Sequence, residues 1–313
     1  MEPGDIADLV QVRAMIAEHG RARARELLGS SKRRLIDITA DVLADETQRI
    51  GITYAGFCLT SLPHKRLPDN QTWKKPGNAV TLLIEPGRQL VNDQEILHGV
   101  PYGAHARMIL LYLQTQAMRT KSPHIELGRS MRNWMERMGI SYGGNTVRAL
   151  RDQAARLSSC SLKFFWANDS ARGFQRAAII KRGLSFLVQQ DARQGALWED
   201  EVVLDPDFYQ ALQDHPVPLR DAAIRALKER SLSLDLYVWL AYRLHALKDD
   251  TGVSWTALQV QFGTPGQKPW HFRQGFLEAF AAALAAYPEA RVGLSEIGIV
   301  LHPSRPPVAA LTA

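Results

Sequence analysis

The chain has 313 residues, of which 46% are hydrophobic and 22% charged, so it can bury a substantial core and divide into two domains. It contains no run of about 18 apolar residues, and residues 1–9 are acidic rather than a basic leader, so we expect no membrane span, no signal peptide and a cytoplasmic protein. The net charge of +6 is uneven, because residues 107–182 hold 14 Lys and Arg against 4 Asp and Glu. Such a concentration favours a polyanionic partner.

The first elements in chain order are helical. Residues 5–50 carry two apolar faces at helical spacing, which predicts a helical N-terminal extension. Between the two faces, residues 21–34 contain six basic residues and one acid. This segment is either a solvated helix face with a linker or an arm that touches phosphate or a partner protein.

The middle of the chain predicts a helix-turn-helix followed by a β-hairpin. Periodicity, caps and turn residues predict strands at 55–62 and 80–84, a helix over 102–119, a short strand at 125–127, a helix capped by Ser130 and ended by Gly139, a helix over 145–157, and a hairpin of 162–166 with 177–188. Helix, short strand, helix, turn, helix and hairpin is the order of a winged helix.

A similar order recurs closer to the C-terminus. The predicted elements there are a helix over 234–247, a helix capped by Ser254, a long helix over 270–286, and strands at 291–294 and 297–301. Setting Ile125 beside Val253 aligns the two series and predicts a structural duplication. We therefore expect an α+β fold of tandem winged-helix domains, with a helical N-terminal extension at 1–50, a first winged-helix domain at 51–195 that is the main DNA-binding domain, a second at 196–304 and a flexible tail at 305–313.

The helix over 145–157 has the pattern of a recognition helix. At about 100° per residue, its apolar side chains fall on one side, whereas Asn145, Arg148 and Arg156 point away. Arg and Asn are the side chains that read guanine and adenine in the major groove, while Arg151 on the flank suits a phosphate. The pair Gly143 and Gly144 allows close backbone approach at the helix start. The alternative is an ordinary amphipathic helix with a solvated Arg face.

The hairpin and the second unit add further candidates for DNA contact. The basic hairpin is expected to follow the DNA backbone or minor groove, and the long helix of the second unit to make weaker contacts. The aromatic run 164–166 is either a buried strand or a base-stacking platform. The complete set of expected DNA-binding residues is Arg129, Arg132, Gly143, Gly144, Asn145, Arg148, Arg151, Arg156, Lys163, Arg172, Arg176, Lys181, Arg182, Lys268, His271 and Gln274.

Motifs for enzymatic chemistry are missing from the sequence. The segment 263–268 has the wrong spacing for a phosphate-binding ATPase loop, and no histidine pair has the spacing of a metal-dependent nicking site. No nucleophile elbow occurs, and Cys58 and Cys160 stand in apolar contexts typical of reduced core thiols. We therefore expect no catalytic activity, no metal and no cofactor.

Several blocks of the sequence resemble a known family. The blocks are Gly99-Val100-Pro101-Tyr102-Gly103-Ala104-His105-Ala106-Arg107, Leu110-Leu111-Tyr112-Leu113-Gln114-Thr115-Gln116-Ala117, Leu127-Gly128-Arg129-Ser130-Met131-Arg132-Asn133-Trp134-Met135 and Tyr142-Gly143-Gly144. They resemble the plasmid-encoded RepA replication initiators of broad-host-range Gram-negative plasmids, and the likeness extends over roughly residues 55–300. Residues 1–50 lie outside the strongest likeness.

The resemblance implies a function and a set of partners. It implies a sequence-specific initiator that binds double-stranded DNA at direct repeats (iterons) of a plasmid origin, helps to open an adjacent AT-rich duplex, and recruits the host replication initiator and the replicative helicase. It also implies a homodimer that represses its own promoter while monomers initiate replication. The alternatives are a winged-helix transcriptional repressor that binds a promoter operator, and a replication enzyme such as a nickase or primase.

Overall fold

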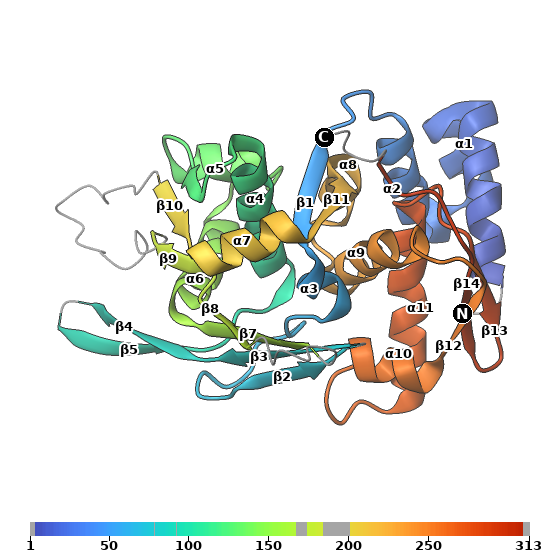
Figure 1. Ribbon diagram of the computed structural model, residues 1–313. Coiled ribbons are helices and arrows are strands. Elements are labelled where there is room, and N and C mark those ends of the chain that lie inside the picture. The colour runs from blue at the N-terminus through green and yellow to red at the C-terminus, as the bar shows by residue number, and fades with distance from the viewer. Residues whose placement is uncertain (1–3, 78, 92, 167–173, 184–200, 309–313) are drawn as a thin grey trace. The chain divides into compact units, whose positions relative to one another are not determined.

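The computed structural model describes residues 4–77, 79–91, 93–166, 174–183 and 201–308. The chain forms two compact units (Figure 1): unit 1 is Met1–Gly51 with Val217–Ala313, and unit 2 is Ile52–Pro216. The chain passes from one unit to the other within β1 (Ile50–Tyr54) and within β11 (Pro216–Arg220). This division differs from the expected boundaries, because the N-terminal residues belong to the same unit as the C-terminal third.

Unit 2 contains a winged-helix core and an added sheet. Its helices are α3 (Ala55–Leu59), α4 (Gly103–Thr120), α5 (Met131–Arg137), α6 (Gly144–Ser159) and α7 (Pro206–Asp214). Its strands are β2 (Trp73–Pro76), β3 (Val80–Glu85), β4 (Gly87–Val91), β5 (Gln94–His98), β6 (His124–Glu126), β7 (Ser161–Trp166), β8 (Phe174–Ala177), β9 (Ile180–Arg182) and β10 (Glu201–Leu204). The expected strand at 80–84, the helix at 102–119 and the short strand at 125–127 are confirmed.

The winged-helix core of unit 2 consists of α4, β6, α5, α6, β9 and β10. Its small sheet has the strand order β6-β10-β9, with Ile125 opposite Val202 and Arg182 opposite Val203. Trp134 of α5 and Leu150 of α6 are completely buried, as is Ile125. The two helices of the helix-turn-helix therefore pack their apolar stripes onto one core, as the helical spacing predicts.

The expected hairpin of 162–166 with 177–188 is right only at its start: β7 pairs antiparallel with β8, with Leu162 opposite Ala177, but the chain after Ala177 pairs elsewhere. β7 lies between β3 and β8 in a separate four-stranded sheet of order β2-β3-β7-β8, whereas β9 pairs with β10. Residues 184–188 lie outside the described residues. Alternating hydrophobicity identifies a strand, but its partners are set by long-range packing, which a local pattern does not contain.

The expected strand at 55–62 is also wrong. Residues 55–59 form the short helix α3, and the preceding residues form β1 instead. The Thr60 hydroxyl donates to the Gly56 carbonyl at 2.9 Å, which closes the last turn of α3. Four of the five residues of α3 are buried, and a short run of apolar residues is equally compatible with a buried strand or a buried helix.

Unit 1 contains the second winged helix. Its helices are α1 (Gly4–Leu28), α2 (Arg33–Leu43), α8 (Asp221–Leu227), α9 (Ser231–Leu244), α10 (Trp255–Phe262) and α11 (Pro269–Ala285), with a 3-10 turn η1 (Ser30–Lys32) before α2. Its strands β12 (Thr251–Ser254), β13 (Val292–Ser295) and β14 (Gly298–Leu301) form a sheet of order β12-β14-β13. Val253 lies opposite Ile299, as Ile125 lies opposite Val202 in unit 2. The two winged helices thus share one strand order, and the expected duplication is present in the fold.

The N-terminal helices are part of this second domain rather than a separate extension. Both α1 and α2 pack on α11, and Val12 and Ile36 are completely buried. The Arg13 guanidinium donates to the carbonyls of Leu284 and Pro288 at 2.9 and 2.8 Å. These contacts satisfy backbone acceptors at the C-terminal end of α11, where a cation is also favoured by the helix dipole.

The expected tail at 305–313 begins as packed chain. The Tyr287 hydroxyl donates to the Arg305 carbonyl at 2.6 Å, and Pro307 is buried. Residues 309–313 lie outside the described residues.

Candidate nucleic-acid interface

The helix-turn-helix of unit 2 positions α6. The Ser130 side chain accepts a hydrogen bond from the Asn133 amide at 3.2 Å and so caps α5, as its sequence position predicts. Gly139 follows α5 with a φ of 70°, a conformation that glycine adopts without steric cost. The side chains of Leu150, Ala154 and Leu157 then fix α6 by packing into the core.

The N-terminal turns of α6 are open to solvent. Asn145 and Arg148 are both exposed, and their side chains approach each other at 3.5 Å. A Cβ at Gly144 would meet nothing within 4 Å, so the backbone at the helix start is accessible to a large ligand. The first amides of a helix have no intrahelical acceptors, and together with the helix dipole they favour an anion at this end. This end of α6 therefore combines exposed amide and guanidinium side chains with an open backbone that favours an anion.

Further cations flank the start of α6. Arg129 and Arg132 are exposed, and the Arg132 guanidinium lies over the Tyr142 ring, 4.4 Å from its centroid. Tyr142 is 54% exposed, and it was not among the expected site residues. Its place in the turn before Gly143 could have indicated this exposure, since an aromatic residue in a polar turn is not part of an apolar stripe that packs into the core. Arg151 is half-buried on the flank of α6.

Arg156 does not belong to this surface. It is 2% exposed, and its guanidinium contacts the carboxylates of Asp152 and Asp69, each at 3.0 Å. It also donates to the Val100 carbonyl at 3.4 Å and lies 5.2 Å from the centroid of the Tyr102 ring. The expectation that Arg156 points outward is therefore wrong.

Arg156 is buried because another segment of the chain covers the C-terminal half of α6. Arg156 is eleven residues after Asn145, which places it within about 20° of the same helix face. The chain around Asp69 and Tyr102 covers that face at the C-terminal half of α6 and leaves the N-terminal half open. The helical phase was right, but phase does not report how deeply each turn is buried.

The Arg156 contacts connect α6 to the segment before α4. The Gln153 side chain accepts from the Tyr102 amide at 2.8 Å and donates to Asp152 at 2.8 Å. Burial acts to raise the pKa of Asp69, but hydrogen bonds from Arg66 and Arg156 outweigh it and hold that pKa below its ordinary value. The ionised network therefore sets the position of α6, while the exposed turns of α6 remain available for a ligand.

The basic strand next to α6 is β9. Lys181 and Arg182 are exposed, and β9 packs beside α6. Arg182 contacts Glu201 at 3.3 Å, and the ring of His124 contacts the same carboxylate at 2.9 Å. A hydrogen bond from His124 lowers the pKa of Glu201, and Arg182 adds to this effect. Lys181 is thus the less engaged of the two cations on β9.

The other expected hairpin cations lie elsewhere. Lys163 is on β7, where its ammonium group pairs with Glu85 of β3 and is largely buried. Arg176 stands opposite Lys163 in the four-stranded sheet, and Arg172 lies outside the described residues. In the aromatic run, Phe164 is 2% exposed, so the run contributes to a strand of the sheet core, although Phe165 is 37% exposed. Lys163 is therefore an internal partner of Glu85 rather than part of the wing.

The second candidate helix is α11. Lys268, His271 and Gln274 are exposed near its start, as expected, and Phe272 and Phe276 are buried. Two residues were not anticipated: Trp270 is 60% exposed, and Arg273 is exposed with its guanidinium 4.7 Å from the centroid of the Trp255 ring. The alternation of aromatic and polar residues at the start of α11 indicates that some of its aromatic side chains are exposed. The expectation that the aromatic residues of this helix form its buried face hid this indication.

The wing of unit 1 is held against the helix-turn-helix. The Trp255 amide donates to the Ile297 carbonyl at 2.9 Å, and its indole NH donates to the Glu296 carbonyl at 3.2 Å. Ile297 at the turn between β13 and β14 is 77% exposed. This wing carries an acid and an apolar residue instead of cations, so it is electrostatically unlike β9.

Metal-ligating side chains, thiols and apolar helices bear on other kinds of chemistry. No group of three or more His, Cys, Asp or Glu side chains is arranged to hold a metal ion among the described residues. Cys58 and Cys160 are free thiols buried in unit 2, and burial raises the pKa of Cys160 to about 12. Within the described part of the chain, no helix is long and apolar enough to cross a membrane.

Known proteins provide an independent comparison. Among solved structures, the chain is similar to domains 2 and 3 of RctB, in crystals of selenomethionine derivatives, with 11% identity, a TM-score of 0.49, and coverage of 80% of this chain and 95% of that chain. A second crystal structure of RctB domains 2–3 gives 12% identity, a TM-score of 0.44, and coverage of 78% and 93%. No curated protein matches the sequence. The family model described as plasmid encoded RepA protein matches residues 100–257, which include α4, α5, α6 and β9. Since this match spans half of the chain, the protein belongs to the family of plasmid-encoded RepA proteins, which are replication initiators.

Proposed function

We propose that this initiator recognises direct repeats, or iterons, in double-stranded origin DNA through the N-terminal turns of α6. The observation that carries the proposal is the exposed pair Asn145 and Arg148 next to the open backbone of Gly143 and Gly144. An α-helix fits the major groove, where Arg forms two hydrogen bonds with guanine and Asn with adenine.

Phosphate contacts surround this reading surface in the proposal. Arg129 and Arg132 are exposed at the start of α5, and Arg151 is half-buried on α6 itself. Lys181 and Arg182 extend the positive surface along β9. Contacts of this type fix the register of a protein on DNA without reading sequence. The smaller contribution of unit 1 comes from Lys268, His271 and Gln274 on α11.

We further infer that the protein acts as a DNA-binding initiator in the cytoplasm rather than as an enzyme. Its sequence has no phosphate-binding ATPase loop, so opening of an AT-rich duplex would draw on binding energy, supercoiling and DNA bending. The strain stored in bent DNA is a few to about 10 kcal/mol, which the protein–DNA contacts supply. Recruitment of the host initiator and replicative helicase, and a homodimeric form that represses the protein's own promoter, complete this proposed role.

Footprinting on the plasmid region upstream of the gene tests the proposal. Protection of tandem direct repeats beside an AT-rich tract supports an iteron-binding initiator. Protection of a single palindrome over a promoter, with no protected repeats, contradicts it and favours a transcriptional repressor. A double variant, Asn145→Ala with Arg148→Ala, should abolish the protected pattern, while Arg23→Gln on the exposed face of α1 should leave it unchanged.

A further inference from the structure

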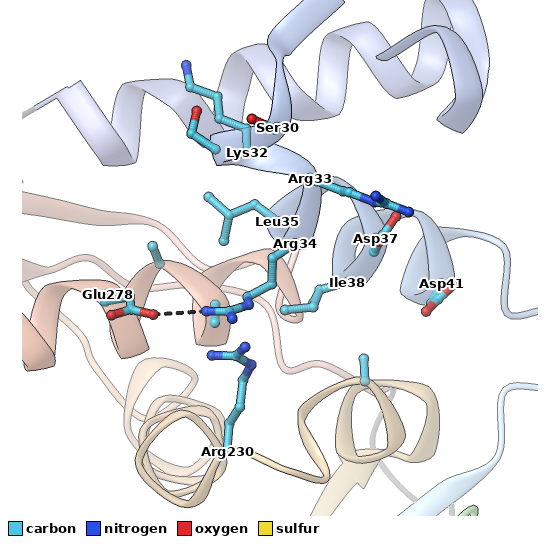
Figure 2. Close-up of a pocket in the computed structure, with 14 residues that line it drawn as sticks. Ser30, Lys32, Arg33, Arg34, Leu35, Asp37, Ile38, Asp41, Arg230 and Glu278 are labelled. Carbon is cyan, nitrogen blue, oxygen red and sulfur yellow. Dashed lines mark hydrogen bonds and ion pairs between the residues drawn. The ribbon is translucent and has the colours of Figure 1, made fainter. Parts of the chain in front are cut away.

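A cavity of about 770 Å³ in unit 1 lies between the start of α2, the junction of α8 with α9, and α11 (Figure 2). Its cationic side chains come from η1, from α2 and from Arg230, and its walls also contain Leu35, Ile38 and Ala281. None of the expected DNA-binding residues lines it. The cavity therefore needs an explanation of its own.

Two guanidinium groups in this cavity lie near one carboxylate, and one of them pairs with it. Arg34 pairs with Glu278 of α11 at 2.9 Å, and Figure 2 shows the Arg230 guanidinium beside the same pair. Arg230 makes no ion pair with any of the described residues. Its burial and the charge of Arg34 lower the pKa of Arg230, and the carboxylates of Glu278 and Glu229 only partly offset them. The Glu278 carboxylate therefore does not balance both guanidinium groups.

The acids on the other wall do not supply that charge. Asp37 is engaged by Arg21 at 3.0 Å and by Arg25 at 2.8 Å, and Asp41 is engaged by Arg21 at 2.6 Å. Figure 2 shows Asp37 and Asp41 on the side of α2 away from Glu278. The cavity therefore presents unbalanced positive charge to a ligand that enters it.

The apolar wall distinguishes between anionic ligands. Ile38 and Ala281 are each 4% exposed, and Leu35 is half-buried beside Arg34. A nucleic-acid backbone would bury no apolar group against this wall, whereas a peptide side chain would. We propose that the cavity binds an acidic peptide segment of a partner protein, in which carboxylates flank an apolar residue. The carboxylates contact Arg34 and Arg230, and the apolar residue packs on Leu35, the apolar side chain that is half-buried. This inference does not depend on iteron binding.

The test uses the full chain and a fluorescein-labelled peptide in which two glutamates flank a leucine, followed by fluorescence anisotropy. Glu278→Gln should increase the affinity for the peptide severalfold, because the resident carboxylate no longer competes for Arg34. Arg34→Gln with Arg230→Gln should lower it at least about tenfold, as expected for lost charge-assisted hydrogen bonds. Arg23→Gln is the matched control, since Arg23 pairs with Glu26 outside the cavity and should not matter.

Three results would overturn the inference. The first is an affinity that none of the cavity variants changes. The second is a peptide with serine in place of leucine that binds as well as the parent, because the apolar wall would then have no role. The third is competition between the peptide and origin duplex together with stronger duplex binding by Glu278→Gln, because the cavity would then be a site for DNA phosphate. A gain of affinity in Glu278→Gln cannot arise from misfolding, so this variant keeps the test decisive.

Discussion

Replacement of Arg156 by alanine should destabilise unit 2 without directly removing a DNA contact. The Arg156 side chain is 3% exposed and holds Asp152 and Asp69 at 3.0 Å. Breaking a fully buried ion pair costs about 3–5 kcal/mol. The two carboxylates are 37% and 34% exposed, so water can rehydrate them, and we expect a loss of about 2–3 kcal/mol. This corresponds to a decrease in Tm of about 4–12 °C for a unit of this size.

Calorimetry and urea unfolding measure this effect, with Arg148→Ala as the control on the exposed part of the same helix. The loss of folding stability at low pH provides a second measurement. The lowered pKa of Asp69 contributes stability that is present above its unfolded pKa and is lost as the pH falls through the folded pKa. Loss of Arg156 raises that pKa, so the variant should begin acid unfolding at a higher pH. Wild-type unfolding combined with relaxed base preference in Arg156→Ala would refute the assignment, since Arg156 would then read DNA.

Three other predictions concern the surface and the core of unit 2. Arg148→Ala should weaken specific DNA binding by about 1–3 kcal/mol and relax preference at one base pair; an equal loss on specific and random duplexes would make Arg148 a phosphate contact. Lys181→Ala should weaken binding to all sequences alike and reduce the slope of log affinity against log salt concentration by about one unit. Lys163→Ala should leave this slope unchanged, because Lys163 faces Glu85. Equal slopes for both variants would show that β9 does not contact DNA. Cys160, with a pKa of about 12 and a buried thiol, should react with iodoacetamide only at the rate of unfolding, and rapid labelling of the native protein would contradict its burial.

Local features of the chain were predicted where a single physical rule applied. Ser130 and Ser254 cap the helices that follow them, because a hydroxyl before an apolar periodic run has an adjacent amide to accept from. The repeated order of elements predicted the two winged helices, which share one strand order. The exposed position of Asn145 and Arg148 followed from the helical phase of their neighbours.

Residues close together in the chain were enough to predict the helices of the two winged-helix units, the serine caps, the concentration of positive charge and the likeness to plasmid-encoded RepA proteins. Three features follow from the folded chain alone: Arg156 is buried, β7 pairs with β3 rather than joining the wing, and α1 and α2 pack on α11. These three outcomes depend on segments far apart in sequence. Periodicity gives the direction in which a side chain points from the axis of its helix or strand. Burial and strand pairing depend on which distant segment packs on that side.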